Sequence, residues 1–231
     1  MKNILIVGAG KGIGLKTAEL LKDENLHTVS RNLTSELEVL NTDFFQLDAS
    51  KDDLSELSLP AELHGIIYCP GSINLKPFNR LSPEDFMEDF QQNVTGAVRI
   101  IQKCLPALRK SGSASVVLFS SVAAKVGMPF HTSVAASKGA LEGFARSLAA
   151  ELSAYKIRVN VIAPSLSDTH LAAQLLSTDE KREASAKRHP LQRIGNAEDS
   201  AQLAAFLVSD QSSWITGQII SVDGGLGNIK L

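Results

Sequence analysis

Residues 8–14, GAGKGIG, can bind phosphate because of their composition and their place in the chain. They follow an apolar run at residues 4–7 that is typical of a buried strand. A glycine turn between a strand and a helix presents backbone N–H groups and the helix N-terminus to a pyrophosphate. The strict GxGxxG spacing is absent because residue 13 is isoleucine. The turn predicts a dinucleotide site, with a plain tight strand-to-helix connection as the alternative.

Two cations lie where an adenosine ribose would be bound. The second expected strand ends in Ser30-Arg31, where an NAD enzyme would place an acidic residue on the ribose 2′-hydroxyl. The planar guanidinium of Arg31 suits a 2′-phosphate, and Lys11 in the glycine turn adds a second positive charge. These residues favour NADP(H), with the alternative that both are solvated surface charges.

Elements that could position such a site alternate along the chain in a strand-helix pattern, with helical periodicity around 13–23, 83–110, 132–155 and 197–209. This pattern predicts a single-domain α/β protein over residues 1–231, with a doubly wound parallel sheet covered by helices on both faces. The polar segment 165–195 lacks periodicity and is expected to be a substrate loop or lid. The seven expected strands are 3–8, 26–30, 43–48, 64–69, 114–120, 157–163 and 218–223.

Composition excludes several other classes of protein. The 231 residues carry a net charge of −2, which gives no electrostatic basis for binding nucleic acid or an anionic membrane. Cys69 and Cys104 are isolated, so neither a disulfide framework nor a metal site is expected. The first apolar run is too short for a signal peptide or a membrane span, and we expect a cytoplasmic protein.

Several further segments resemble the short-chain dehydrogenase/reductase family over nearly the whole chain. The glycines fit its Gly-x3-Gly-x-Gly form, and Ser121 and Lys138 have the spacing of its Ser-x12-Tyr-x3-Lys motif. Val134 stands in the place of the catalytic tyrosine, and an isopropyl group cannot donate a proton. The pattern also departs at residues 68–71, YCPG, which lack both asparagines of the family's Asn-Asn-Ala-Gly stretch, and at Ser165, which replaces a glycine.

The resemblance implies roles for individual residues. Ser121 would hydrogen-bond the substrate carbonyl, Asn93 would hold a water molecule in a proton relay, and Lys138 would bind the nicotinamide ribose. It also implies a homodimer or homotetramer. The cofactor-binding residues implied by the turn, the cations and the resemblance are Gly8, Gly10, Lys11, Gly12, Ile13, Gly14, Ser30, Arg31, Asp48, Ala49, Gly71, Asn93, Lys138, Pro164, Ser165 and Thr169.

Loss of the tyrosine leaves both the proton donor and the activity of the protein open. His131 lies seven residues before Lys138, the separation of the Tyr-x6-Lys motif in the family's enoyl-reductase branch, and imidazole can exchange a proton near neutral pH. Its alternative role is to cap the following helix, and Thr132 and Ser133 are further expected caps. The leading prediction is an NADPH-dependent oxidoreductase that reduces a carbonyl or an activated double bond of a small organic substrate. A second is a catalytically silent NADP(H)-binding subunit or redox sensor that acts through a partner, and a third is a structural subunit whose cofactor only stabilises the fold.

Overall fold

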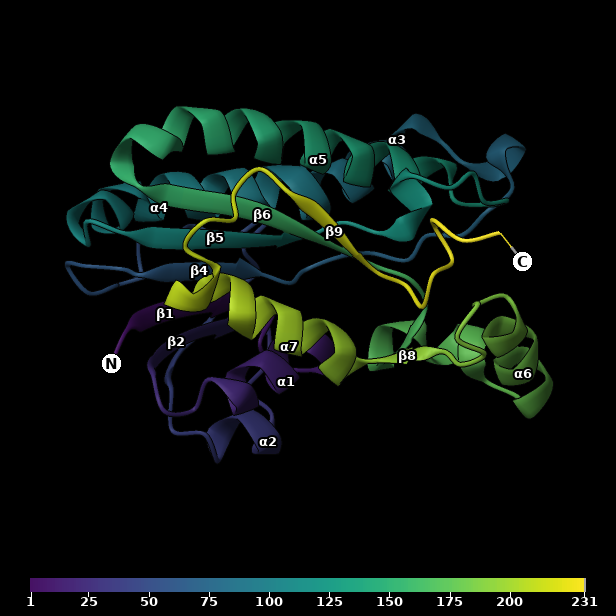
Figure 1. Ribbon diagram of the computed structural model, residues 1–231, viewed down its shortest axis with the longest axis horizontal. Coiled ribbons are helices and arrows are strands. Elements are labelled where there is room, and N and C mark those ends of the chain that lie inside the picture. The colour runs from purple at the N-terminus through teal and green to yellow at the C-terminus, as the bar shows by residue number, and fades with distance from the viewer. Residues whose placement is uncertain (231) are drawn as a thin grey trace.

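The structure, a computed structural model, describes residues 1–230 and is built around a seven-stranded parallel sheet (Figure 1). The strand order is β3-β2-β1-β4-β5-β6-β9, so the chain reverses direction across the sheet between β1 and β4. All seven predicted strands are confirmed. Their bounds are β1 (Asn3–Val7), β2 (Asn25–Ser30), β3 (Asp43–Gln46), β4 (Gly65–Tyr68), β5 (Ala114–Phe119), β6 (Ile157–Pro164) and β9 (Ile219–Val222).

The central strands are apolar because both faces of the sheet are covered. In β1, Leu5 and Val7 belong to the core on one face, while Ile4 and Ile6 belong to the core on the other. Helices α4 and α5 cover the first face, and α1 and α7 cover the second (Figure 1). The helices are α1 (Gly12–Leu20), α2 (Ser35–Glu38), α3 (Pro83–Phe90), α4 (Gly96–Lys110), α5 (Thr132–Leu152), α6 (Asp179–Lys187) and α7 (Ala197–Val208).

The predicted helix 83–110 consists of two α-helices joined by a π turn. Ser82 begins α3 with a capping box, in which its hydroxyl accepts from the Asp85 amide and the Asp85 carboxylate accepts from the Ser82 amide. A π turn at Gln91–Thr95 then connects α3 to α4 without a break in the helical path. Asn93 lies inside this turn and is fully buried.

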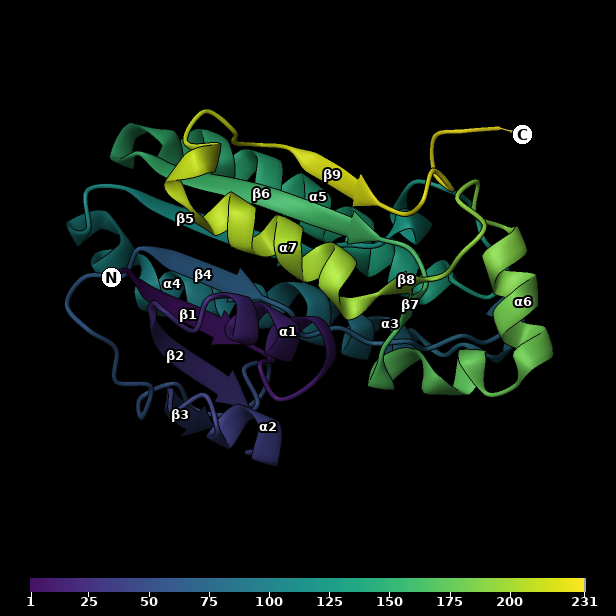
Figure 2. The ribbon, with the colours of Figure 1, turned by 60° about the horizontal axis from the view of Figure 1, so that its bottom comes forward.

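The predicted loop 165–195 contains more regular structure than its sequence indicated. It leaves the sheet at β7 (Ser167–Asp168), forms a 3₁₀ helix at His170–Leu176 and then α6, and returns at β8 (Gly195–Asn196). Strands β7 and β8 pair in parallel and close the base of the segment. Figure 2 shows α6 beyond the carboxyl ends of the main strands. No helical periodicity is visible there because α6 buries only Ser185 and its remaining residues are charged or alanine.

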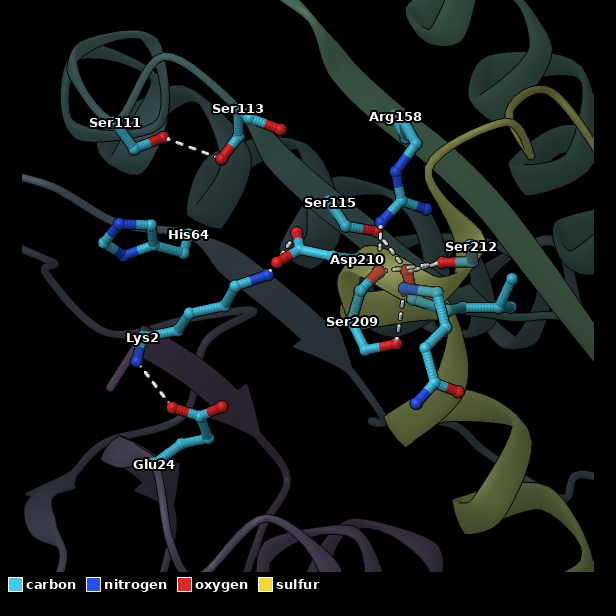
Figure 3. Close-up of polar contacts among 12 residues, drawn as sticks. Lys2, Glu24, His64, Ser111, Ser113, Ser115, Arg158, Ser209, Asp210 and Ser212 are labelled. Atoms are coloured by element: carbon cyan, nitrogen blue, oxygen red, sulfur yellow. Dashed lines mark hydrogen bonds and ion pairs between the residues drawn. The ribbon is translucent and has the colours of Figure 1, made fainter.

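The opposite, amino-terminal edge of the sheet carries a separate polar cluster (Figure 3). Arg158, near the start of β6, donates to the Ser209 carbonyl at 3.0 Å, and Lys2 forms an ion pair with Asp210 at 2.6 Å. These contacts fasten the segment after α7 to the sheet. Within residues 1–230, no helix is both long enough and apolar enough to cross a membrane.

Candidate functional site

A first cavity of about 490 Å³ opens at the carboxyl ends of β1, β2 and β4. This is the place where strand order reverses and where doubly wound sheets bind their ligands. The predicted cofactor residues that line it are Gly8, Gly10, Lys11, Gly12, Ile13, Gly14, Ser30, Arg31, Asp48, Ala49, Gly71 and Thr169.

The glycine turn owes its shape to two of its glycines. Gly8 has φ = 82°, in the region that favours glycine, and its amide donates to the Val29 carbonyl at 2.8 Å. A Cβ atom on Gly14 would lie 2.2 Å from the Gly8 carbonyl oxygen, so α1 can approach the turn only without a side chain there. Lys11 is the N-cap of α1 and makes no side-chain capping bond. The N-terminus of α1 therefore faces the cavity with no side-chain oxygen of Lys11 or Gly12 to compete with a phosphate.

Arg31 and Lys11 line this cavity without forming a hydrogen bond or ion pair through their side chains to any of the described residues. Ser30 ends β2 and is followed by Arg31, so no carboxylate occupies the position used for a ribose 2′-hydroxyl. The Ser30 hydroxyl donates to the Asn32 carbonyl at 2.6 Å. Burial acts to raise the pKa of Asp48, but hydrogen bonds from Ser50 outweigh this and hold the pKa below its usual value. The cavity thus combines a phosphate-binding turn with two free cations, which fits NADP(H).

A second cavity of about 340 Å³ adjoins the first. Ile13, Cys69, Gly71, Thr169 and Leu171 line both cavities, so the two form one continuous depression. Much of the second cavity is apolar, with side chains such as Ile73, Leu75, Met128 and Leu175. Its polar side chains include the predicted residues Ser121, His131, Lys138 and Ser165, together with Arg188 and His189 from the segment after β7. Pro164 also lines it.

Ser121 and Lys138 reach the second cavity from different elements. Ser121 follows β5, and its Oγ atom accepts from the Ala123 amide at 3.2 Å, which leaves the hydroxyl hydrogen available to a ligand. Lys138 lies in α5, is 5% exposed and donates from Nζ to the Phe119 carbonyl at 2.6 Å. Burial lowers the pKa of Lys138 to about 8, against the opposing influence of Asp89 and Cys69.

Val134 and His131 border the same cavity on the first turns of α5. Val134 is buried and presents only hydrocarbon. His131 occupies the N-cap position, but its side chain makes no capping bond, because Nδ1 instead lies 2.7 Å from the Pro129 carbonyl. The expected capping role of the imidazole is therefore wrong. Thr132 and Ser133 are helical residues rather than caps, since α5 begins at Thr132.

Asn93 lines neither cavity and lies behind the residues that form the wall of the second one. Its Nδ2 atom is 2.8 Å from the Asp89 carbonyl and 3.1 Å from the hydroxyls of Ser72 and Ser137. A carbonyl can only accept, so this contact fixes which end of the amide is the donor. The Oδ1 atom is buried and has no hydrogen-bond partner among the described residues.

Sequence reasoning missed the polar residues around Asn93. Asp89 is buried, and its carboxylate accepts from the hydroxyls of Ser72 and Ser133. One signal was available, because Ser133 and Ser137 are four residues apart within the expected helix 132–155 and share a helix face. Arg188 and His189 were also left without an assigned role, because nothing in the sequence pattern brings the end of α6 to the cavity.

Comparison with known proteins agrees with this geometry. The profile of a family described as enoyl-(acyl carrier protein) reductase matches residues 8–227. The chain is 35% identical over 241 residues to a tropinone reductase homologue of Arabidopsis thaliana, covering 97% of this chain and 92% of that protein. A 3-oxoacyl-(acyl-carrier-protein) reductase of Thermotoga maritima is 31% identical over 246 residues, covering 97% of each. The chain belongs to the short-chain dehydrogenase/reductase family.

Solved structures of this family share the fold. A short-chain dehydrogenase/reductase of Mycobacterium ulcerans is 28% identical, with a TM-score of 0.86, and the match covers 98% of this chain and 90% of that one. The structure of ElxO with NADP bound is 26% identical, also with a TM-score of 0.86, and covers 98% of this chain and 99% of its own. The predicted Rossmann fold is confirmed, and the family is one of oxidoreductases.

Proposed function

We propose that this short-chain dehydrogenase/reductase is an NADP(H)-dependent oxidoreductase that reduces a carbonyl or an activated double bond of a small organic substrate. The observation that carries the proposal is the continuity of the two cavities. One holds the glycine turn with the free cations Arg31 and Lys11, and the other holds Ser121 and Lys138. The NADP bound to ElxO, a protein of the same fold, supports the choice of cofactor.

The cofactor would be held mainly by this chain's glycine turn, with the 2′-phosphate between Arg31 and Lys11. Asp48 and Ala49 would border the adenine, while Gly71, Pro164, Ser165 and Thr169 would border the nicotinamide half. When bound, NADPH supplies a hydride. Lys138 would hold the nicotinamide ribose. Asn93, behind the residues that line the second cavity, would hold a water molecule in a proton relay.

Ser121 would donate its hydroxyl hydrogen to the substrate oxygen, because its oxygen already accepts from the Ala123 amide. The apolar wall would exclude water from the body of the substrate. Besides water, two groups at this wall are candidate proton donors to that oxygen, the Lys138 ammonium and the His131 imidazole. Val134 supplies none.

A cofactor-consumption screen tests this function. Purified protein with NADPH is offered ketones, quinones and enals, and oxidation is followed by absorbance. We expect sustained turnover on at least one class, reduced by Ser121→Ala and retained by Ser213→Ala, an exposed serine outside both cavities. Tight NADPH binding without turnover on any class would argue against catalysis.

That last result would favour the second candidate, a catalytically silent NADP(H)-binding subunit or redox sensor. The observation that supports it is the hydrocarbon surface of Val134 beside Lys138. A sensor requires a partner whose binding differs between NADPH and NADP⁺. Affinity capture with the protein loaded with each form would show such a partner, and equal capture by both forms would count against sensing.

We also propose that the protein forms a homodimer or homotetramer through α5. A Cβ atom placed on Gly139 or Gly143 would meet no described atom within 4 Å apart from its sequence neighbours and the backbone of its own helix, so this helix leaves an open, small-residue strip. A strip of this kind permits close approach of a helix from a second copy. Light scattering coupled to gel filtration measures the oligomeric state, and a monomer at micromolar concentration would contradict the proposed assembly.

A further inference from the structure

Asp89 is a buried carboxylate without a cationic partner at ion-pair distance among the described residues, and none of the roles above involves it. Ser72 donates to its Oδ1 atom at 2.5 Å, and Ser133 donates to its Oδ2 atom at 2.5 Å. Both oxygens therefore act as hydrogen-bond acceptors, as in the ionised form of a carboxylate. Asp89 therefore places a negative charge behind the wall of the second cavity.

The hydrogen bonds around Asp89 have a defined direction. The Ser72 hydrogen goes to Asp89, so the Ser72 oxygen accepts from Asn93. Ser137 donates to the Val134 carbonyl at 2.9 Å, so its oxygen also accepts from Asn93. With the Asp89 carbonyl, three acceptors surround the two hydrogens of the Asn93 amide nitrogen, while Oδ1 has no partner among the described residues.

The unpaired oxygen and the Lys138 ammonium lie beside the same glycine. A Cβ atom on Gly71 would be 3.5 Å from Asn93 Oδ1 and 3.5 Å from Lys138 Nζ. Gly71 lines both cavities. The network thus runs from the Asp89 carboxylate, through Ser72 and Asn93, to the point where Lys138 meets the cavity.

Asp89 is the anion that favours the charged form of Lys138. Burial lowers the pKa of Lys138. Asp89 has the largest opposing effect on this pKa, and Cys69 has a smaller one. Burial raises the pKa of the Cys69 thiol to about 12, so this group is neutral near pH 7 and Asp89 remains the charge that acts. Other ionisable groups near Lys138 lie on α5 and around the second cavity. Glu142 on α5 accepts from the Ser120 hydroxyl, and His131, Arg188 and His189 line the cavity.

We propose that Lys138 delivers the proton in the reduction, and that Asp89 is the positioning residue that keeps the ammonium charged beside the substrate. This inference rests on the proposed function. An N–H bond of Lys138 breaks, the O–H or C–H bond of the product forms, and the neutral amine regains a proton from water. Nδ1 of His131 is committed to the Pro129 carbonyl, so the neutral imidazole offers only an acceptor at Nε2.

Competitive acetylation tests the charge coupling without substrate or cofactor. Folded protein is treated with trace acetic anhydride at a series of pH values, and the labelling of Lys138 relative to the exposed Lys22 is measured by mass spectrometry. We expect Asp89→Asn to lower the apparent pKa of Lys138 by about one unit. Glu88→Gln, which removes an exposed charge from the same helix, should leave it unchanged. An unchanged pKa in Asp89→Asn would overturn the proposal.

If Asp89→Asn fails to fold, Asp89→Ser gives the same comparison, since it also removes the charge and keeps a polar partner for Ser72 and Ser133. Circular dichroism before labelling identifies which variant to use. The Lys138 titration in that variant then decides the coupling by the same criterion.

The pH dependence of turnover tests proton delivery. Only the protonated amine can donate, so the rate should fall as pH rises through the pKa of Lys138, and the fall should move to lower pH in Asp89→Asn. A fall that stays in place while the lysine titration shifts, or that disappears in His131→Ala, would reject Lys138 as donor. Absence of turnover on every substrate would reject the reduction and this donor step, whereas acetylation would still decide the coupling of Asp89 to Lys138.

Discussion

The Nε2 atom of His189 lies 2.9 Å from the Oγ atom of Ser165, which joins the end of the α6 segment to the end of β6. The other ring nitrogen, Nδ1, lies 2.8 Å from the Ser185 carbonyl and must carry the hydrogen in a neutral ring. Nε2 then accepts from Ser165. Ser165 stands where the family pattern has a glycine, and a glycine could not make this contact. The departure at this position therefore has a structural role.

Replacing Ser165 by alanine should destabilise the protein and loosen the α6 segment. His189 is only 1% exposed, so its Nε2 atom would be left without a partner, at a cost of about 1–3 kcal/mol. Urea unfolding measures this cost, and amide exchange should quicken in α6. Ser213→Ala is the matched control. Equal stability of the two variants would show that the contact contributes nothing.

Exchanging the cation after β2 should change the cofactor preference. The parent protein is expected to bind NADPH more tightly than NADH, because Arg31 and Lys11 are free to meet a 2′-phosphate. Arg31→Asp should reverse this order in titration calorimetry, while Lys22→Asp, the same charge change at an exposed site outside both cavities, should not. A parent protein with equal affinities, or one that prefers NADH, would refute the assignment.

Adding a phenol at position 134 should increase carbonyl reduction. Val134 borders the second cavity one helical turn before Lys138, so Val134→Tyr would place a hydroxyl near the ammonium. A positioned general acid contributes about 10²-fold or more, and we expect a gain of up to about 10²-fold. Val134→Phe carries the same ring without the hydroxyl and should show no gain. If both variants behave alike, the pocket is not organised around a donor at this position.

Removing the imidazole of His131 should have little effect on stability. A lost helix cap costs about 0.5–2 kcal/mol, but the ring makes no bond to the amides of α5, so the loss should fall below that range in urea unfolding. Turnover per folded molecule should be retained, since Lys138 is the proposed donor. A drop of about 10²–10⁴-fold with unchanged NADPH affinity would instead assign the acid to His131.

Both cysteines should resist reaction with a thiol reagent in the folded protein. Burial raises the pKa of Cys69 and of Cys104 to about 12, and the thiolate is the reactive form. With Ellman's reagent near pH 8, we expect no reaction until denaturant is added, after which both thiols should react. Rapid reaction of Cys69 in native protein would contradict this prediction and show that the thiol is reached through the cavities that it lines.

The sheet could be predicted from sequence because its strands are buried on both faces. Runs such as residues 4–7 and 116–119 are apolar along their length and separated by helical periodicity, which leaves few alternatives. Helix α6 could not be predicted in this way. It buries only Ser185, so its sequence lacks the apolar stripe that reveals a helix.

The site was predictable where backbone shape or a free charge was required, as at the glycine turn and Arg31. The placement of Asn93 was not, because a π turn changes which helix face a residue occupies and leaves no mark in the spacing. The network around Asp89 joins three separate segments of the chain, and contacts between such segments follow only from the assembled fold. The sequence interpretation therefore named Asn93 and Lys138 but not the carboxylate that connects them.

The π turn also takes one extra residue into a long helical path. Its hydrogen bonds run from residue i to i+5, so each residue advances less than the 100° or so of an α-helix. Removing one residue from Gln91–Thr95 would restore ordinary winding and leave α3 and α4 nearly in phase. Asn93 would then lose the widened turn that places its amide beside Ser72 and Ser137, although no side chain of the network had been altered. Within this turn the number of residues is itself a determinant of the site, and a deletion there should be tolerated less well than most substitutions.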